Sequence, residues 1–292
     1  MNMSSERYRF DVGCFKCIAI SDGTFSYPHP SKNVFINFFV NAPEDHLKRV
    51  LRDHYLVPEQ WEEYVSPYTC LVISKGKDHV LIDTGAGNIA PTTGNLIPNL
   101  KAEGISPEDI DTVIITHGHP DHIGGSIDSE GKPAFPNARY VMWKDECDFW
   151  TDPDLSGLKI DDHGKEILVK VAQNALHQIR DQLELIKRET EIKPGIRAIS
   201  APGHTPGHIA IEVVSDDAQL LYMSDTVLHP IHLEQPEWCS SVAFDPEKVM
   251  ASRLRLLSKA ASEKALVMAT HFPFPGLGYI EKKEEAWKWQ PI

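Results

Sequence analysis

The sequence has no apolar run long enough to cross a membrane, and no run of lysine or arginine that could follow a chain of phosphates. Its 292 residues carry a formal net charge of -13, which disfavours binding to nucleic acid. The polar segment from Met1 to Arg9 leads into no apolar stretch of signal-peptide length. These absences predict a soluble, cytoplasmic protein that has neither a nucleic-acid partner nor a membrane partner.

Cysteine is scarce and does not suggest a disulfide framework. The chain has five cysteines, an odd number at scattered positions, which is typical of free thiols in a reducing compartment. Cys14 and Cys17 form a Cys-x-x-Cys pair, but no second pair follows, so a zinc ribbon is not expected. We expect these two thiols to be buried or partly buried instead.

Short apolar runs rich in β-branched residues alternate with segments of helical periodicity along the chain. We expect strands over 15–20, 34–40, 68–74, 79–83, 111–116, 139–143, 196–200, 208–214, 219–223 and 265–270. We expect helices over 43–55, 95–102, 165–187 and 245–261. No internal repeat or low-complexity linker divides the chain, so we expect a single domain over residues 1–292.

The densest group of metal-binding side chains lies directly after the predicted strand 111–116. His117, His119, Asp121 and His122 fall within six positions. Imidazole and carboxylate groups are the ligand types that suit Zn²⁺ and similar divalent ions. The glycine and proline residues among them favour a tight loop. A curled loop can direct the first two side chains to one metal ion and the other two to a second.

Three other predicted strands also end in residues that can bind a metal ion. These residues are His204 and His208 after strand 196–200, Asp225 after strand 219–223, and His271 after strand 265–270. In layered α/β proteins, binding sites gather beyond the carboxyl ends of strands. Of His204 and His208, we expect His204 to be the ligand, because it lies in a turn rich in glycine and proline. His208 opens the next strand, and we expect it to support a ligand instead.

These residues resemble the motifs of the metallo-β-lactamase-fold hydrolases. The matching segments are Leu81 to Gly85, Thr116 to Gly125, Ala201 to Gly207, Ser224-Asp225 and Ala269 to His271. They occur in the family's order and span most of the chain from 70 to 275. The resemblance implies an α/β fold, the four-layer αββα metallo-β-lactamase sandwich, with two metal ions in the cleft between its sheets.

The resemblance also implies a role for each ligand. The first metal ion is implied to be bound by His117, His119 and His204, and the second by Asp121, His122 and His271. Asp225 is implied to bridge both ions. The two ions are implied to be zinc, with iron, manganese or cobalt as alternatives. Asp83 matches an aspartate that supports the ligand loop without binding metal. Asp121 and Asp225 are the nearest carboxylates to take a proton during catalysis.

Within the family, the chain is most similar to the branch that contains methyl parathion hydrolase and the acyl-homoserine lactone lactonases. The segment His271 to Gly278, the tryptophans at 287 and 289 and the long N-terminal extension carry this similarity. It implies a dinuclear hydrolase that cleaves a lactone, an aryl ester or a phosphotriester by attack of a metal-bridging hydroxide. Leu228 departs from the lactonase pattern, which has a substrate-contacting tyrosine at that position.

Two other activities stay open on the same fold. A thioesterase of the glyoxalase II type would use the same ligands, but it binds its substrate through a basic C-terminal region. Here the segment 281–292 contains three lysines and three glutamates. An iron-dependent redox enzyme is the other alternative. A true β-lactamase is not expected, because that branch lacks the bridging carboxylate that Asp225 provides.

The substrate pocket is expected to be apolar, and its partner a small-molecule ester or lactone. The candidate lining residues are Trp150, Leu228, Trp238, Phe272 and Phe274. A helical insertion around 145–187 exceeds a short connection. It is expected either to cover the metal cleft, with Phe149 or Trp150 toward the substrate, or to pack outside the sheet. A homodimer is compatible with the sequence.

Overall fold

The computed structural model describes residues 6–28, 37–56, 63–284 and 286–292. Across these residues the chain forms two seven-stranded sheets, and each sheet uses one continuous half of the strands. The first contains β1 to β7 and the second contains β8 to β14, with sequence neighbours lying side by side. Each half of the strands therefore forms its own sheet.

The first sheet begins as an antiparallel meander and continues as a parallel sheet. Its strands are β1 (Arg7–Val12), β2 (Phe15–Pro28), β3 (Glu63–Lys75), β4 (Asp78–Ile82), β5 (Thr112–Ile114), β6 (Arg139–Trp143) and β7 (Leu183–Ile186). β1 to β4 pair antiparallel, whereas β4 to β7 pair parallel. Parallel neighbours need crossover connections, and these place helices on the outer face of the sheet.

The second sheet is antiparallel except for one pair of strands. Its strands are β8 (Thr190–Lys193), β9 (Ile196–Ser200), β10 (Ile209–Ser215), β11 (Ala218–Tyr222), β12 (Leu266–Met268), β13 (Leu277–Lys283) and β14 (Ala286–Pro291). Among the described strands of this sheet, only β11 and β12 pair in parallel, and the long helix α8 (Pro246–Glu263) lies between them in the sequence.

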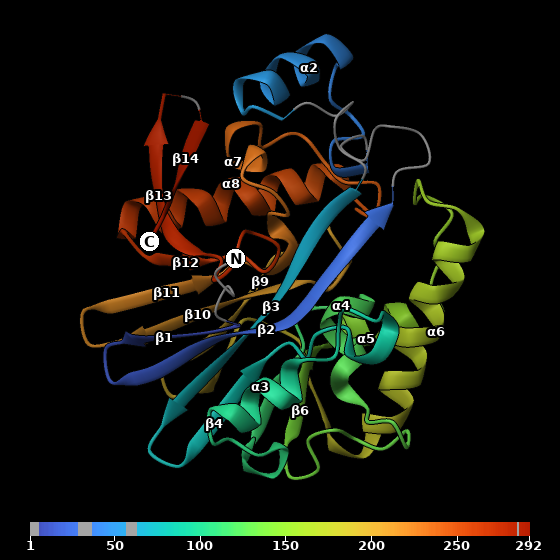
Figure 1. Ribbon diagram of the computed structural model, residues 1–292, viewed down its shortest axis with the longest axis vertical. Helices are drawn as coiled ribbons and strands as arrows, with labels where there is room; N and C mark the ends of the chain where they lie inside the picture. Colours follow the sequence, from blue (N-terminus) through green and yellow to red (C-terminus); the bar gives the residue numbers. More distant parts are fainter. Residues whose placement is uncertain (1–5, 29–36, 57–62, 285) are drawn as a thin grey trace.

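Helices cover the outer faces of both sheets and complete four layers. Besides α8, they are α3 (Leu96–Ala102), α4 (Pro120–Ile123), α5 (Lys144–Thr151), α6 (Asp162–Ile179) and α7 (Ile231–Glu234). The helix α2 (Glu44–Asp53) instead packs in a separate apolar cluster that includes Ile231 and Trp238. One apolar cluster joins α3, α5 and α6 to the first sheet, a second lies between the sheets, and a third joins α8 to the second sheet. In Figure 1, α3, α5 and α6 lie below and to the right, and α8 lies above. The predicted αββα sandwich is confirmed.

Most of the predicted elements lie where the sequence placed them, but three expectations were wrong. The helix expected over 165–187 ends at Ile179, because Leu183–Ile186 pairs with β6 as a strand. Asn37 and Phe38 are helical and not part of a strand over 34–40, whose first residues lie outside the described ones. Cys14 is exposed in the β1–β2 turn, although Cys17 is buried as expected.

The insertion around 145–187 packs outside the first sheet and does not cover the metal cleft. Ala172, Ala175 and Leu176 of α6 belong to the cluster on the outer face of that sheet. The apolar stripe of the helix is therefore buried in the core.

Among the described residues, no helix has the length and apolar character needed to cross a membrane.

Two adjacent valines of β10 test the sandwich directly. Val213 is fully buried between the sheets, whereas Val214 is 43% exposed. Val213→Ala is expected to lower the free energy of unfolding by about 2 kcal/mol, because it leaves a cavity in the core. Val214→Ala should change it by less than about 0.5 kcal/mol. Urea denaturation measures both, and equal effects would contradict the placement of β10.

Candidate metal centre

The predicted metal-binding side chains come together at the carboxyl ends of four strands. β5 leads into the loop that carries His117 and His119, and Pro120 then starts the short helix α4. Two groups of possible ligands form, with the ligand atoms of each group within 4.8 Å of one another. The groups are His117, His119, His204 and Asp225, and Asp121, His122 and His271. The structure thus assembles all seven residues that the sequence singled out as ligands.

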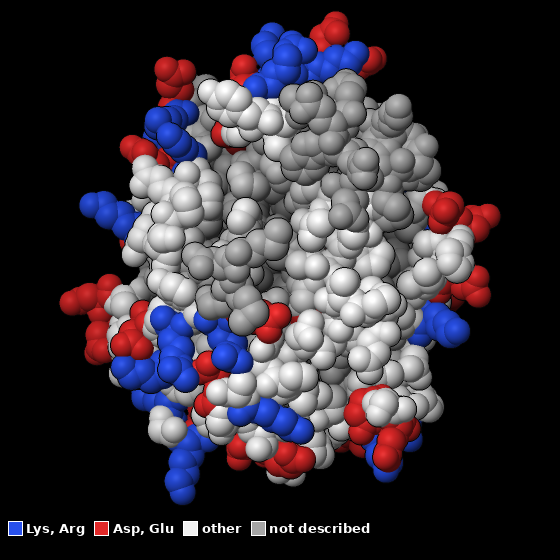
Figure 2. Space-filling view, in the orientation of Figure 1, with Lys and Arg blue, Asp and Glu red and all other residues white. Residues whose placement is uncertain are grey.

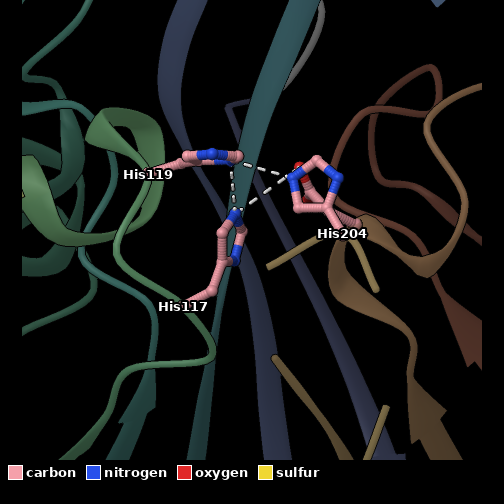
Figure 3. A group of neighbouring side chains, drawn as sticks. His117, His119 and His204 are labelled. Carbon is pink, nitrogen blue, oxygen red and sulfur yellow. Dashed lines mark hydrogen bonds and ion pairs between the residues drawn. The ribbon is translucent and has the colours of Figure 1, made fainter. Parts of the chain in front are cut away.

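The three imidazoles of the first group point their ring nitrogens at a common centre (Figure 3). His119 Nδ1 lies 3.1 Å from His117 Nε2 and 2.9 Å from His204 Nε2. Nitrogen ligands at the usual zinc distance are about 3.3 Å apart when they occupy the corners of a tetrahedron. The observed spacing is therefore close to that of a metal site.

Asp225 lies between the two groups and turns one oxygen toward each. Its Oδ2 is 3.1 Å from His204 Nε2 in the first group. Its Oδ1 is 3.0 Å from His122 Nε2 and 3.2 Å from His271 Nε2 in the second group. Asp121 completes the second group, with its Oδ2 3.4 Å from His271 Nε2.

Several of these atoms lack the partners that buried polar atoms normally have. In the part of the chain that the structure describes, His122 Nε2 and Asp225 Oδ1 are buried and lie 3.0 Å apart as an ion pair, but neither atom makes a well-aligned hydrogen bond. Leaving a buried polar atom unsatisfied costs about 1–3 kcal/mol. A divalent cation would satisfy both atoms, and imidazole with carboxylate is a donor set that such cations accept. The residues present therefore fit a metal site.

Burial and neighbouring charges together set the protonation states at the site. Burial lowers the pKa of His117 and His119 well below the usual range, so both rings are neutral. Burial opposes ionisation of Asp225, but the neighbouring His122 and His271 hold its pKa well below the usual range. Neutral imidazoles and an ionised carboxylate are the forms that bind metal. Burial opposes the charged form of His122 and His271, but the carboxylate of Asp225 holds the pKa of both rings above the usual range, so these two rings must release a proton when a metal ion binds.

Asp83 connects the ligand loop to both sheets through hydrogen bonds. Its carboxylate accepts hydrogen bonds from the backbone N–H and the hydroxyl of Thr116, at 2.8 and 2.9 Å. It also lies 2.8 Å from His122 Nδ1 and accepts a bond from Tyr222 Oη at 3.0 Å. Because Nδ1 of His122 is engaged, its Nε2 is left to face the metal site. Asp83 thus occupies the supporting place that the sequence predicted.

His208 contacts a ligand without entering either group. Its Nδ1 lies 3.1 Å from the Ala201 carbonyl, and its Nε2 accepts the backbone N–H of Asp225 at 3.2 Å. Burial lowers the pKa of His208 to about 3, so the ring is neutral. A neutral ring that donates from Nδ1 can accept at Nε2, which orients the backbone of Asp225.

A family model described as the Metallo-beta-lactamase superfamily matches residues 64–271. The chain belongs to the metallo-beta-lactamase superfamily. The N-acyl homoserine lactonase AiiA of Bacillus thuringiensis subsp. kurstaki is 22% identical over 225 residues, which cover 70% of this chain and 81% of the relative.

Solved structures of this superfamily match nearly the whole chain. One is AidC, a dizinc quorum-quenching lactonase in complex with a product, N-hexnoyl-L-homoserine. It is 28% identical, with a TM-score of 0.88 over 98% of this chain and 97% of AidC. The hydrolase AbOPH is 27% identical, with a TM-score of 0.86 over 100% of this chain and 99% of AbOPH. With the ligand groups above, these matches make the chain a metal-dependent hydrolase with a divalent-metal site.

The expected pocket residue Trp150 lies in the core instead. Its side chain is fully buried in the cluster on the outer face of the first sheet. Its indole Nε1–H donates to Glu146 Oε1 at 2.7 Å, and its ring meets that of His119 edge to face at 5.7 Å. The aromatic ring thus packs against the ligand His119 and does not line an open pocket.

Two other expected pocket residues are also core residues. Phe272 is fully buried and packs against Trp289 at a ring distance of 4.9 Å. Trp238 is buried and packs against Phe39 at 5.6 Å. Leu228 is buried and Phe274 is partly exposed, so their contact with substrate stays a prediction.

Two buried charges near the site were missed at the sequence level. Glu146 of α5 is fully buried and contacts both ligand loops. Arg253 of α8 donates to the carbonyls of Thr226, Pro236 and Trp238 at 2.6–2.7 Å, and so secures the loop that follows Asp225. Neither residue belongs to a motif, and a charged residue on a helix is ordinarily solvated. No local signal in the sequence distinguishes them.

Two tyrosines beside the second group were missed as well. Tyr27 of β2 and Tyr68 of β3 have their hydroxyl oxygens 3.3 Å apart, and the Tyr68 ring meets that of His271 edge to face at 5.5 Å. Burial raises the pKa of both phenols, and the charges of Asp121 and Asp225 raise it further. Both hydroxyls are therefore protonated at neutral pH and able to donate hydrogen bonds.

Metal removal should destabilise the protein. Chelator-treated protein is expected to unfold at a lower temperature than zinc-loaded protein, since binding at 1,000 times Kd adds about 4 kcal/mol of stability. Differential scanning calorimetry with and without added zinc measures the shift. His204→Ala should show a smaller zinc response. An unfolding temperature that does not respond to chelator or zinc would contradict the metal site.

Proposed function

We propose that this protein hydrolyses lactones, using two zinc ions held by the seven assembled ligands. The position of Asp225 is the observation that carries the proposal. One of its carboxylate oxygens faces the first group and the other faces the second. This placement would allow two ions to share Asp225, and seven ligands exceed the four that a single tetrahedral zinc site uses.

When bound, a pair of divalent ions supplies Lewis acidity and lowers the pKa of a water molecule toward neutrality. The chain contributes a proton acceptor and a fixed geometry. The Asp121 side chain is 17% exposed, whereas that of Asp225 is 4% exposed. Asp121 is therefore the carboxylate that can pass a proton to solvent. Asp83 and His208 keep the ligands in place while this happens.

An uncharged, aromatic surface beside the ligands supports a neutral substrate. Tyr27 packs edge to face against Phe25 at 4.8 Å, and Tyr68 lies against the ligand His271. In Figure 2, charged side chains lie around the rim of the displayed face, and the described residues over β2 and β3 are mostly uncharged. Because one of the hydroxyls of Tyr27 and Tyr68 donates to the other, the pair keeps one proton that can be donated to a substrate carbonyl. The side chain of Leu228 has no such donor.

The relatives support the choice of a lactone. AiiA is named as an N-acyl homoserine lactonase, and AidC is a lactonase whose structure contains an acyl-homoserine product. An N-acyl homoserine lactone is neutral, with a ring ester for the metal ions and an acyl chain for the aromatic surface. We therefore place this class before aryl esters, phosphotriesters and thioesters.

A panel of four substrates tests the proposed class. Zinc-loaded protein should hydrolyse an N-acyl homoserine lactone with a higher kcat/KM than a matched aryl ester, phosphotriester or thioester. The metal-free protein serves as the control and should be inactive on all four. A preference for the thioester would favour a glyoxalase II type of activity, and activity on the phosphotriester alone would exclude the lactone assignment.

Asp121→Ala should abolish most of the hydrolysis without unfolding the protein. The first group keeps its three histidines, but the second loses a ligand and the site loses its partly exposed carboxylate. We expect kcat to fall about 100-fold or more, the scale for losing one electrostatic group at a reacting centre. Circular dichroism checks the fold, and Asp181→Ala, whose side chain is 85% exposed, is the surface control. Near wild-type turnover would count against the two-metal mechanism.

A further inference from the structure

Glu146 is a fully buried carboxylate whose four partners come from the two ligand loops and from its own helix. Its Oε1 accepts the backbone N–H of Gly118 at 2.8 Å and the indole N–H of Trp150 at 2.7 Å. Its Oε2 accepts the hydroxyl of Thr205 at 2.7 Å and the backbone N–H of Gly207 at 2.9 Å. Each oxygen therefore has two donors and no acceptor.

The positions of these partners connect Glu146 to one ligand group. Gly118 lies between the ligands His117 and His119, and Thr205 directly follows the ligand His204. One carboxylate thus links the two loops that carry all three histidines of the first group. Each oxygen of the carboxylate accepts hydrogen bonds from a different loop. The distance between the two oxygens therefore fixes the distance between the loops.

Two glycines allow the helix of Glu146 to approach the loops. A Cβ atom on Gly118 would lie 2.3 Å from Trp150 Nε1, and a Cβ atom on Gly207 would lie 2.3 Å from the backbone nitrogen of Glu146. Any side chain at either position would push α5 away from the ligand loops. Both glycines lie in the loops that Glu146 binds.

The charge of Glu146 has no cationic partner among its four contacts. Burial raises the pKa of the Glu146 carboxyl, and its four neutral N–H or O–H donors oppose that rise because they favour the ionised form. A buried negative charge beside the histidines attracts a cation placed among them, and the low dielectric strengthens that attraction. Geometry and charge therefore act on the first group in the same direction.

We propose that Glu146 is a positioning residue that sets the metal affinity of the first ligand group by fixing the loops of His117, His119 and His204 around one ion. The inference rests on the metal site of the proposed function but not on its substrate. Outer partners of metal ligands are commonly worth 10- to 100-fold in metal affinity. The second group has no contact with Glu146 among the hydrogen bonds of the described residues, and its affinity should not change.

Glu146→Gln is the most informative substitution because it keeps the size of the side chain. A glutamine has one accepting oxygen and one donating NH2 group, so it can serve only one of the two loops. The other loop is left with a backbone N–H facing an NH2 group. The variant therefore loosens one loop and removes the charge without opening a large cavity.

The experiment titrates metal-free protein with Co²⁺ against a competing chelator. It is done in an Asp121→Ala background, which retains the first group, and in a His204→Ala background, which retains the second. Glu146→Gln should weaken Co²⁺ binding at least about 10-fold in the first background and change it less than about 2-fold in the second. The visible spectrum of bound Co²⁺ should also change in the first background alone.

Asp22→Asn is the matched control. Asp22 is likewise fully buried and accepts the backbone N–H groups of Ala86 and Leu96 at 2.8 and 3.1 Å, neither of them adjacent to a ligand. It should destabilise the fold and leave Co²⁺ affinity unchanged. If Glu146→Gln behaves in the same way, Glu146 only stabilises the fold and the inference is overturned.

If Glu146→Gln does not fold, Thr205→Val tests the same inference. It removes a single hydroxyl donor and should weaken Co²⁺ binding in the Asp121→Ala background by about 3-fold or more, as one of four contacts. Unchanged affinity in that folded variant would overturn the inference. A wild-type chain that binds no Co²⁺ would overturn the metal site as well, whereas metal binding without lactone hydrolysis would overturn only the proposed substrate.

Discussion

The gathering of five mostly buried histidines and the partly exposed Asp121 around the buried carboxylate of Asp225 is the constraint on which the rest of the structure depends. Imidazole nitrogens 3 Å apart compete for the same space and the same protons unless a cation lies among them. Asp225 reduces this conflict because each of its oxygens faces a different group. The surrounding contacts of Asp83, His208, Arg253 and Glu146 hold these groups together against their mutual repulsion.

The sandwich supplies this arrangement through its strand ends. β5, β9, β11 and β12 all terminate at the same edge, and each leads into a ligand within a few residues. The cores on both faces of the two sheets fix the strands, so the loops start from rigid positions. Flexible loops on a packed scaffold are where binding residues usually lie. Here the loops are themselves braced by buried carboxylates, which leaves the ligands little freedom.

The ligands could be predicted from the sequence because each follows a recognisable strand, and the motif around His117 is dense in metal-binding groups. The order of layers followed from resemblance to a known family. Glu146 and Arg253 could not be predicted, since most of their partners are distant in sequence and a charged residue on a helix gives no local sign that it is buried. Trp150 was misplaced for the same reason: a tryptophan in a polar stretch looks exposed until its indole N–H finds a buried acceptor. Leu183 continued the helical spacing of apolar residues in the sequence, but in the structure it pairs with β6 as the first residue of a strand.

The metal content of the zinc-saturated protein tests the central claim most directly. Elemental analysis after removal of loosely bound ions should give two zinc ions per chain for the wild type. His271→Ala should give one, because it disrupts the second group and leaves the histidines of the first intact. A single ion per fully loaded wild-type chain, or two ions that survive in His271→Ala, would contradict a site in which Asp225 joins two metal ions.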